Sequence, residues 1–259
     1  MGMIEVQAVS KRYRLGKHTT TLKESVAGWL TGAPSADWVW ALRNVDVSVD
    51  AGEAVGIVGH NGAGKSTLLR LLARLSKPTT GRIVTKGRMA ALLELGAGFH
   101  PDLTGRENVF LNGTLLGLTR AEIGRRFDEI VAFSEVERFI DTPVKHFSRG
   151  MMLRLSFAVA AHLNCDLLLV DEVLSVGDAR FAEKCLARMR RLRDHGMTIV
   201  LTSHDLDTVV GFCGRALLVH GGSLVADGDP EEVVHLYASK IGLPQAAKPH
   251  PVVHARSWI

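Results

Sequence analysis

The sequence predicts an α/β fold built on a parallel sheet, and three observations support this prediction. Short apolar runs at Ala54–Val58 and at residues 166–170 and 197–202 are typical of strands buried on both faces. Segments of helical period alternate with them, at residues 121–139 and 180–194. The 259 residues are 46% hydrophobic and 22% charged, the balance of a globular chain with a sizeable core. Strands that alternate with helices imply a parallel α/β core.

The first predicted elements are two strands with a helix between them. Residues 4–9 and 45–49 alternate polar and apolar side chains, as half-buried strands do. Between these strands, Thr21 and Glu24 have the spacing of a capping box. One helical face there carries Leu22, Val26, Trp29 and Leu30. A short amphipathic helix is therefore expected at residues 21–30.

The composition excludes several classes of protein. No apolar run approaches the roughly 18 residues of a membrane-spanning helix, and residues 1–10 lack the basic and apolar regions of a secretory signal. Cys165, Cys185 and Cys213 lack the spacing of metal ligands and suit a reducing compartment. The formal charge of +4 is too small to favour nucleic acid over an anionic membrane surface.

A glycine-rich loop follows the strand predicted at Ala54–Val58. Its residues are Gly59, His60, Asn61, Gly62, Ala63, Gly64, Lys65, Ser66 and Thr67, and the first eight fit the pattern G-x-x-x-x-G-K-[ST]. A helix beginning near Lys65 would place backbone N–H groups and its positive end around phosphates. Lys65 would then reach the β- and γ-phosphates, and Ser66 would ligate Mg²⁺. A glycine-rich turn with a chance lysine would not explain why both flanking elements are present.

Two acidic residues and a histidine follow later strands. Asp171 and Glu172 come after four apolar residues, so Asp171 would hold Mg²⁺ and Glu172 would polarise the water that attacks the γ-phosphate. His204 would contact the γ-phosphate and orient Glu172. Taken singly, such residues are more often solvated turn residues or structural histidines. Together with the loop, they predict a site that holds Mg²⁺ and directs water onto a γ-phosphate.

With these residues in place, the chain resembles the nucleotide-binding subunit of an ABC transporter. Residues 147–151 stand where that family carries its L-S-G-G-Q signature, and they retain Ser148 and Gly150, the positions of the phosphate contact. Residues 175–178 match the D-loop, with Asp178 carried over. Tyr13 stands where the family often stacks an aromatic ring on adenine; alternatively, it only closes a strand end.

This resemblance implies a domain organisation. Residues 1–240 would form a P-loop ATPase core with an antiparallel β subdomain and a helical subdomain at about residues 95–160, which includes a helix at 153–162. Residues 241–259 are expected to be a C-terminal tail, because residues 242–259 contain Pro244, Pro249 and Pro251 and no acidic residue.

The departures from the family pattern resemble the Wzt-type subunits that export lipid-linked polysaccharides such as O-antigen, teichoic acid and mycobacterial galactan. Residues 93–108 contain no Q-loop glutamine, and Glu94 is expected to take that role at magnesium and at the membrane partner. The helix at 21–30 resembles an element near the cytosolic mouth of the channel, where Trp29 would meet lipid headgroups or the partner. Alternatively, its apolar face packs on the protein's own core.

The same resemblance implies the assembly. Two chains would form a homodimer that sandwiches two ATP molecules, each held by one chain's phosphate loop and the other's signature helix. A transmembrane permease of the Wzm type would handle the lipid-linked polysaccharide, so the subunit would lie at the cytoplasmic face of the membrane without contacting nucleic acid. The arginine- and alanine-rich composition mildly favours a galactan.

Further expectations concern the C-terminus and the alternatives. Some members of this exporter group carry a C-terminal β-sandwich of roughly 100 residues. The residues after 228–232 are too few for one, so export should not depend on it. A soluble ABC ATPase acting on nucleic acid or ribosomes is the main alternative, but such proteins usually carry tandem cassettes or long coiled-coil insertions. A non-catalytic nucleotide-gated scaffold would not need Asp171, Glu172 and His204.

Overall fold

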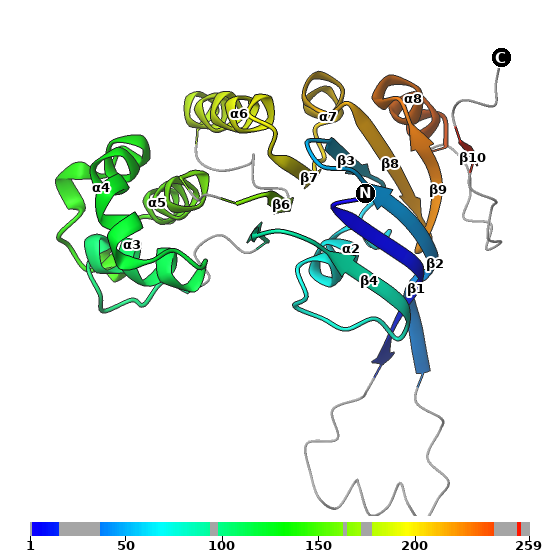
Figure 1. The fold of residues 1–259 in the computed structure, drawn as a ribbon, viewed down its shortest axis with the longest axis horizontal. Coiled ribbons are helices and arrows are strands. Elements are labelled where there is room, and N and C mark those ends of the chain that lie inside the picture. Colours follow the sequence, from blue (N-terminus) through cyan, green and yellow to red (C-terminus); the bar gives the residue numbers. More distant parts are fainter. Residues whose placement is uncertain are drawn as a thin grey trace, which may run out of the picture.

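The computed structural model describes residues 2–15, 37–93, 98–162, 165–171, 178–240 and 253–254. Two sheets form its centre (Figure 1). The smaller sheet is antiparallel and has the order β2-β1-β4, with bounds β1 (Ile4–Leu15), β2 (Asp37–Val49) and β4 (Thr80–Thr85). None of the helices in the described ranges is long and apolar enough to span a membrane.

The larger sheet has the order β10-β9-β8-β3-β7-β6-β5. Its strands are β3 (Ala54–Val58), β5 (Met89–Leu92), β6 (Leu167–Asp171), β7 (Thr198–Thr202), β8 (Arg215–His220), β9 (Ser223–Gly228) and β10 (Val253–His254). The strands from β5 to β8 in this order are mutually parallel, whereas β9 is antiparallel to β8. The predicted parallel core is therefore confirmed.

Successive side chains of the larger sheet enter two different cores, because strand residues alternate between faces. In β3, Val55 and Ile57 pack with helix α2 (Lys65–Leu72) and the smaller sheet, while Ala54 and Val58 belong to the opposite core. That opposite face is covered by α6 (Ala179–Asp194), α7 (Leu206–Phe212) and α8 (Pro230–Lys240). Burial on both faces explains why these strands are continuously apolar.

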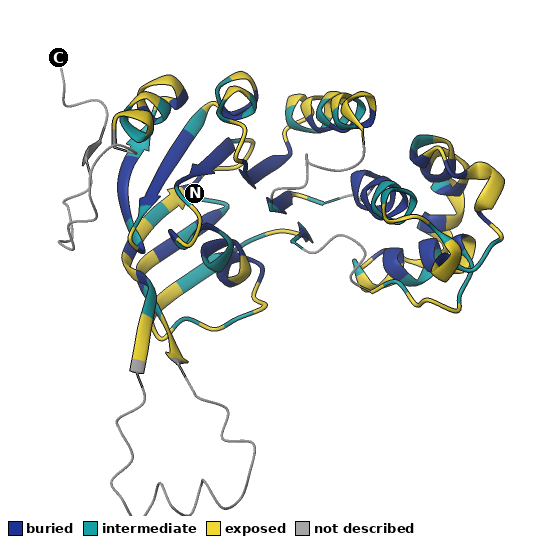
Figure 2. Cartoon of the chain, turned by 180° about the vertical axis from the view of Figure 1, so that it is seen from behind, coloured by how far each residue is buried: buried dark blue, intermediate teal, exposed yellow. Residues whose placement is uncertain are grey.

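A group of helices lies to one side of the sheets, between β5 and β6 in the chain (Figure 1). It contains α3 (Gly105–Leu115), α4 (Arg120–Ser134) and α5 (Arg149–Ala161), with short 3-10 helices at Glu137–Phe139 and Val144–His146. Figure 2 shows that the outward surfaces of α3 and α4 are largely exposed. Capping boxes begin both helices, at Thr104 with Glu107 and at Thr119 with Glu122.

Several element boundaries differ from the sequence prediction. β1 and β2 extend well beyond residues 4–9 and 45–49, because they pair with each other as far as Leu15 and Asp37. The helix predicted over residues 121–139 ends at Ser134, since Glu135 adopts a left-handed φ of 60°. The helix predicted at 153–162 begins earlier, at Arg149, which makes Ser148 its N-cap.

Some predicted features lie outside the described residues. These are the helix at 21–30, Glu94, Glu172, residues 175–177 and most of the expected tail. Within that tail, Val253 and His254 are described, and they pair in parallel with Ala226 and Asp227 of β9.

Candidate functional site

Residues 59–64 connect β3 to α2, and their backbone packs closely on neighbouring strands. Gly64 precedes α2 with a φ of 115°, a conformation that favours glycine. A Cβ atom on Gly64 would lie 2.5 Å from the carbonyl oxygen of Ala41, and one on Gly59 would lie 2.2 Å from that of Val219. Side chains at these two positions would therefore collide with the backbone of β2 and β8.

Hydrogen bonds from the turn between β8 and β9 also hold the loop. The Gly222 N–H donates to the carbonyl of Ala63 at 3.0 Å, and the Arg43 N–H donates to the carbonyl of Gly222 at 2.7 Å. Within the loop, the Ala63 N–H donates to the carbonyl of His60 at 3.1 Å. The shape of the loop is thus fixed by strands that are distant from it in the sequence.

Lys65 is the first residue of α2, and it is only 5% exposed. Its Nζ donates to the carbonyl oxygens of Gly59 at 2.8 Å and His60 at 3.2 Å. No side chain caps the N-terminus of α2. A cavity of about 170 Å³ opens at this end of the helix, lined by Asn61, Gly62, Gly64, Lys65, Ser66, Thr67 and, from β2, Ala41. Backbone N–H groups, a lysine and a helix N-terminus in one cavity suit a phosphate.

Oxygen atoms suited to a divalent cation meet beside this cavity. The Ser66 hydroxyl donates to Oδ1 of Asp171 at 3.3 Å, which brings together the start of α2 and the end of β6. Magnesium prefers oxygen ligands and keeps several of its waters, so this pair fits Mg²⁺ without a larger protein cage. The described ranges contain no group of three or more His, Cys, Asp or Glu residues that could hold a metal.

Thr202 is a site residue that sequence reasoning missed. It is paired with Asp171 across β6 and β7, and its hydroxyl donates to Oδ1 of Asp171 at 2.5 Å. This bond orients the carboxylate toward Ser66. The available signal was the position of Thr202 at the end of a buried strand, but a threonine there is also explained by its preference for strands.

His204 lies just beyond the same strand, two residues after Thr202, and is exposed. The next residue, Asp205, caps α7 by accepting a hydrogen bond from the Asp207 N–H at 3.1 Å. The end of β7 lies beside Asp171, so His204 is near the predicted site. Its contact with a γ-phosphate stays a prediction.

Ser148 occupies the N-terminus of α5, in the helical group. Its Oγ accepts a hydrogen bond from the Met151 N–H at 3.1 Å, and Gly150 lies in the first turn. Because a hydroxyl both accepts and donates, this cap leaves the O–H of Ser148 as a donor for another group. Figure 1 shows α5, whose N-cap is Ser148, apart from α2 in this chain.

Asp178 connects α5 to the start of α6. Its Oδ1 caps α6 by accepting from the Phe181 N–H at 2.9 Å, and its Oδ2 forms an ion pair with Arg154 of α5. The Phe181 hydrogen bond, followed by the nearby charge of Arg154, lowers the pKa of the Asp178 carboxyl. Arg154 also donates to Glu135 at 3.1 Å.

Tyr13 lies on β1, opposite Val39 of β2, and is 41% exposed. Val39 is two residues from Ala41, which lines the phosphate-loop cavity. The Nζ of Lys11 lies 5.0 Å from the centre of the Tyr13 ring. This position suits an aromatic ring that stacks on a base bound beside the phosphates, which stays a prediction.

The chain is similar to proteins of one large family. The family model described as ABC transporter matches residues 42–175. The O-antigen export system ATP-binding protein RfbB of Myxococcus xanthus is 46% identical over 244 residues, which cover 93% of this chain and 56% of that protein. The teichoic acids export ATP-binding protein TagH of Lactococcus lactis is 39% identical, covering 90% of this chain and 50% of that protein.

A solved structure shows the same likeness. A dimeric bacterial ABC transporter cassette matches with a TM-score of 0.70 and 25% identity, covering 88% of this chain and 99% of that one. The chain spans 56% and 64% of the length of the first two curated relatives that it matches.

Proposed function

Because this chain belongs to the ABC transporter family, we propose that it is the ATP-hydrolysing subunit of an exporter of lipid-linked polysaccharide. The observation that carries ATP hydrolysis is the meeting of the phosphate loop, Ser66 and Asp171 at the carboxyl ends of β3 and β6. The curated relatives support the cargo, since their names assign them to O-antigen and teichoic acid export. Galactan is a finer proposal that rests on composition alone.

In the proposed reaction, ATP and water give ADP and phosphate. Lys65 and the N-terminal turn of α2 neutralise the charge of the phosphates, and the glycine backbone lets them approach closely. Ser66 and Asp171 would hold Mg²⁺, with Thr202 fixing the orientation of the carboxylate. The cation would offset negative charge on the transferring phosphoryl group.

The remaining chemistry is assigned to residues near the same strand ends. Glu172, directly after Asp171, polarises the attacking water by accepting its proton. His204 contacts the γ-phosphate and holds Glu172 in position. Glu94 is proposed as a further group at magnesium and at the membrane partner. Tyr13 stacks on the adenine ring.

A second copy of the chain completes the proposed site. Ser148 and Gly150 of one chain would meet the γ-phosphate held by the other chain, and Asp178 would lie at the same junction. Two observations support this: α5 lies apart from α2 within one chain, and a related cassette is described as dimeric. ATP would bridge the two chains, and hydrolysis would release them, since the bridge needs the γ-phosphate.

The assembly proposed for export includes a transmembrane permease of the Wzm type. The permease would carry the polysaccharide, and this chain would lie against it at the cytoplasmic face of the membrane. Opening and closing of the ATP-bound dimer would then supply the mechanical step.

The decisive experiment is the substitution Glu172→Gln, with Glu183→Gln on the exposed surface of α6 as a control of equal charge change. Glu172→Gln should bind ATP, lose hydrolysis and accumulate as a dimer on gel filtration with ATP. Unchanged hydrolysis would remove Glu172 from its role. A variant that binds ATP yet stays monomeric, even with the permease present, would reject the dimer. Accumulation of a lipid-linked glycan in cells lacking the chain would identify the cargo.

A further inference from the structure

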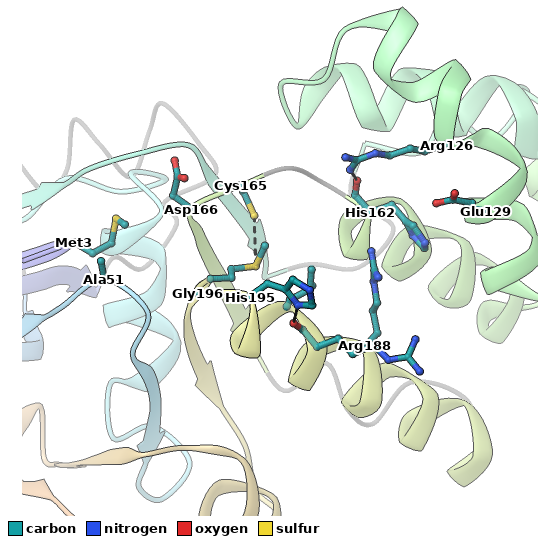
Figure 3. A pocket seen from close by; sticks show the side chains of 13 residues that line it. Met3, Ala51, Arg126, Glu129, His162, Cys165, Asp166, Arg188, His195 and Gly196 are labelled. Atoms are coloured by element: carbon teal, nitrogen blue, oxygen red, sulfur yellow. Dashed lines mark hydrogen bonds between the residues drawn. The ribbon is translucent and has the colours of Figure 1, made fainter.

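A second cavity, of about 800 Å³, lies where the strands β6 and β7 begin, whereas the phosphate loop follows the end of β3. Figure 3 shows its lining side chains. It is bounded by α4, the end of α5, the start of β6 and the last turns of α6. The charged or titratable residues that matter here are Arg126, Glu129, His162, Arg188, Arg191 and His195. Leu192 and Met197 provide apolar wall.

This cavity is separate from the nucleotide site. It is lined by Cys165 and Asp166 before β6 and by Met197 before β7, whereas Asp171 and Thr202 end the same two strands beside the phosphate loop. The four residue steps from Leu167 to Asp171 put about 13 Å between the two edges of the sheet. A phosphate bound at the phosphate loop therefore does not reach the second cavity.

Two of the arginines are held in place by backbone carbonyls. Arg126 Nη1 donates to the carbonyl of His162, and Arg188 Nε donates to the carbonyl of Ala161 at 3.0 Å. Both carbonyls lie at the C-terminal end of α5, where the helix dipole favours cations. A guanidinium has five N–H donors, so these bonds orient the two side chains and leave most of their donors for other groups.

The positive charges in this cavity are only partly compensated. Within the described ranges, Arg126, Arg188 and Arg191 form no ion pair with a carboxylate. Burial lowers the pKa of Arg188, and the charges of Arg126 and Arg191 lower it further, while Glu129 opposes them. The other lining carboxylate, Asp166, accepts a hydrogen bond from the Arg88 N–H at 2.7 Å.

We propose that this cavity binds a small phosphate-bearing molecule through Arg126, Arg188 and Arg191. A phosphoryl group accepts paired hydrogen bonds from guanidinium groups, and its charge would relieve the repulsion among three arginines that Glu129 opposes only in part. The cavity has the size of ordinary small-molecule sites, roughly 300–1,000 Å³. Leu192 and Met197 on the cavity wall would contact an apolar part of the bound molecule.

A purely structural role explains only part of this arrangement. Capping the end of α5 accounts for Arg126 and Arg188, which reach its last carbonyls. It gives no role to Arg191, an exposed residue like Arg190, whose side chain lines the cavity without a hydrogen bond in the part of the chain that the structure describes. Arg191 is therefore the residue whose replacement separates ligand binding from folding.

The test uses the full chain with Lys65→Met, so that the phosphate loop does not contribute binding. Inorganic phosphate and pyrophosphate are titrated by calorimetry, and flotation is measured with phosphatidylcholine vesicles that contain phosphatidic acid. Saturable binding in either arm is expected, and the arm that binds identifies the source as a soluble phosphate or a lipid headgroup. Absence of binding in both arms would overturn the proposal.

Matched variants then localise the binding. Arg191→Gln should weaken it about tenfold, as expected for loss of a charged hydrogen bond. The control Arg190→Gln removes the same charge from the neighbouring exposed position, which does not line the cavity, and should leave binding unchanged. If both variants weaken binding equally, the effect is one of overall charge, and the proposal that the cavity is the binding site is wrong. Arg188→Gln is a second variant, and Arg191→Gln decides alone if Arg188→Gln does not fold.

Discussion

The N-terminal ends of α2 and α5 are built in opposite ways. α2 is preceded by Gly64, whose φ is 115°, and has no side-chain cap, whereas Ser148 caps α5 through the Met151 N–H. α3, α4 and α6 are also capped, by Thr104, Thr119 and Asp178. Loss of such a side-chain cap to alanine costs about 1 kcal/mol, whereas a glycine at the same position costs only a few tenths. Gly64 therefore leaves the first N–H groups of α2 open to a ligand at little cost in stability, which is what the phosphate loop predicts.

The two ends also differ in what stabilises them without ligand. The α2 end is held by backbone packing against Ala41 and by the hydrogen bond from Gly222. The α5 end is held by its own serine. Substitutions at the N-terminal end of α2 should therefore change nucleotide binding and backbone strain. At the N-terminal end of α5, some substitutions should change the free energy of unfolding and others the ATPase activity.

The largest expected effect is at Lys65. Lys65→Met should lower ATP hydrolysis by roughly 10²–10³-fold, because it removes a charged donor from the developing phosphate charge. Nucleotide binding should weaken as well, measured by calorimetry with ATP and Mg²⁺. Hydrolysis near the wild-type rate would break the comparison, since the α2 end would then not be the phosphate site.

Gly64→Ala tests the strain at the α2 end. The new Cβ would combine a φ of 115° with a 2.5 Å approach to the carbonyl of Ala41, so the free energy of unfolding should fall by more than the roughly 1–3 kcal/mol of a strained φ alone. Gly62→Ala is the matched control, because Gly62 has a φ of 79° but no neighbour within 4 Å of the added atom. Denaturant unfolding should show a smaller loss for Gly62→Ala. Equal losses would mean that packing against β2 does not matter.

At Ser148, the effect of a substitution on the free energy of unfolding should be separable from its effect on ATPase activity. Ser148→Ala removes the cap and should lower the free energy of unfolding by about 1 kcal/mol. Ser148→Asp keeps a capping acceptor and should restore that stability, but it loses the O–H donor and adds charge, so ATPase activity should stay low. Ser148→Thr retains both functions and serves as the control. If Ser148→Asp recovers activity together with stability, the hydroxyl acts only as a cap.

The smallest expected effect is at the other end of α5, at His162. Burial lowers the pKa of His162, whose Nδ1–H donates to the carbonyl of Ala158 at 2.7 Å. The unfolded chain therefore binds the proton more readily, and stability should fall as the pH drops from about 7 through the ordinary histidine pKa of about 6.5. One such group contributes at most about 1.4 kcal/mol per pH unit.

The measurement is the unfolding free energy of wild type and His162→Gln at several pH values between pH 5 and pH 8. The difference between the two proteins should narrow as the pH falls, because the variant lacks this titration. A constant difference would assign the acid sensitivity to other groups. His195→Gln, which replaces an exposed histidine, is the control.

The phosphate loop was predictable because its pattern and its flanking elements are local in the sequence. β3 has the predicted bounds, and α2 begins at Lys65 as expected. The meeting of Ser66 with Asp171 also followed, since the carboxyl ends of parallel strands share one edge of a sheet.

Contacts that depend on strand register or on single backbone angles were not predictable. Thr202 reaches Asp171 because those two residues are paired across β6 and β7, which no local pattern specifies. Helix α4 ends early because Glu135 turns left-handed, although the apolar period continues to Phe139. The three arginines of the second cavity come from α4 and α6, and only the packing at the end of α5 brings them together.

The support of the phosphate loop by Ala41, Val219 and Gly222 has a consequence for the thermodynamics of association. A binding loop that is already ordered loses little conformational entropy when the ligand binds, so most of the contact energy is retained as affinity. Encounter with nucleotide, rather than rearrangement of the loop, should then govern the rate of capture. Discrimination among nucleotides would have to arise elsewhere, in the contacts made with the base and the sugar.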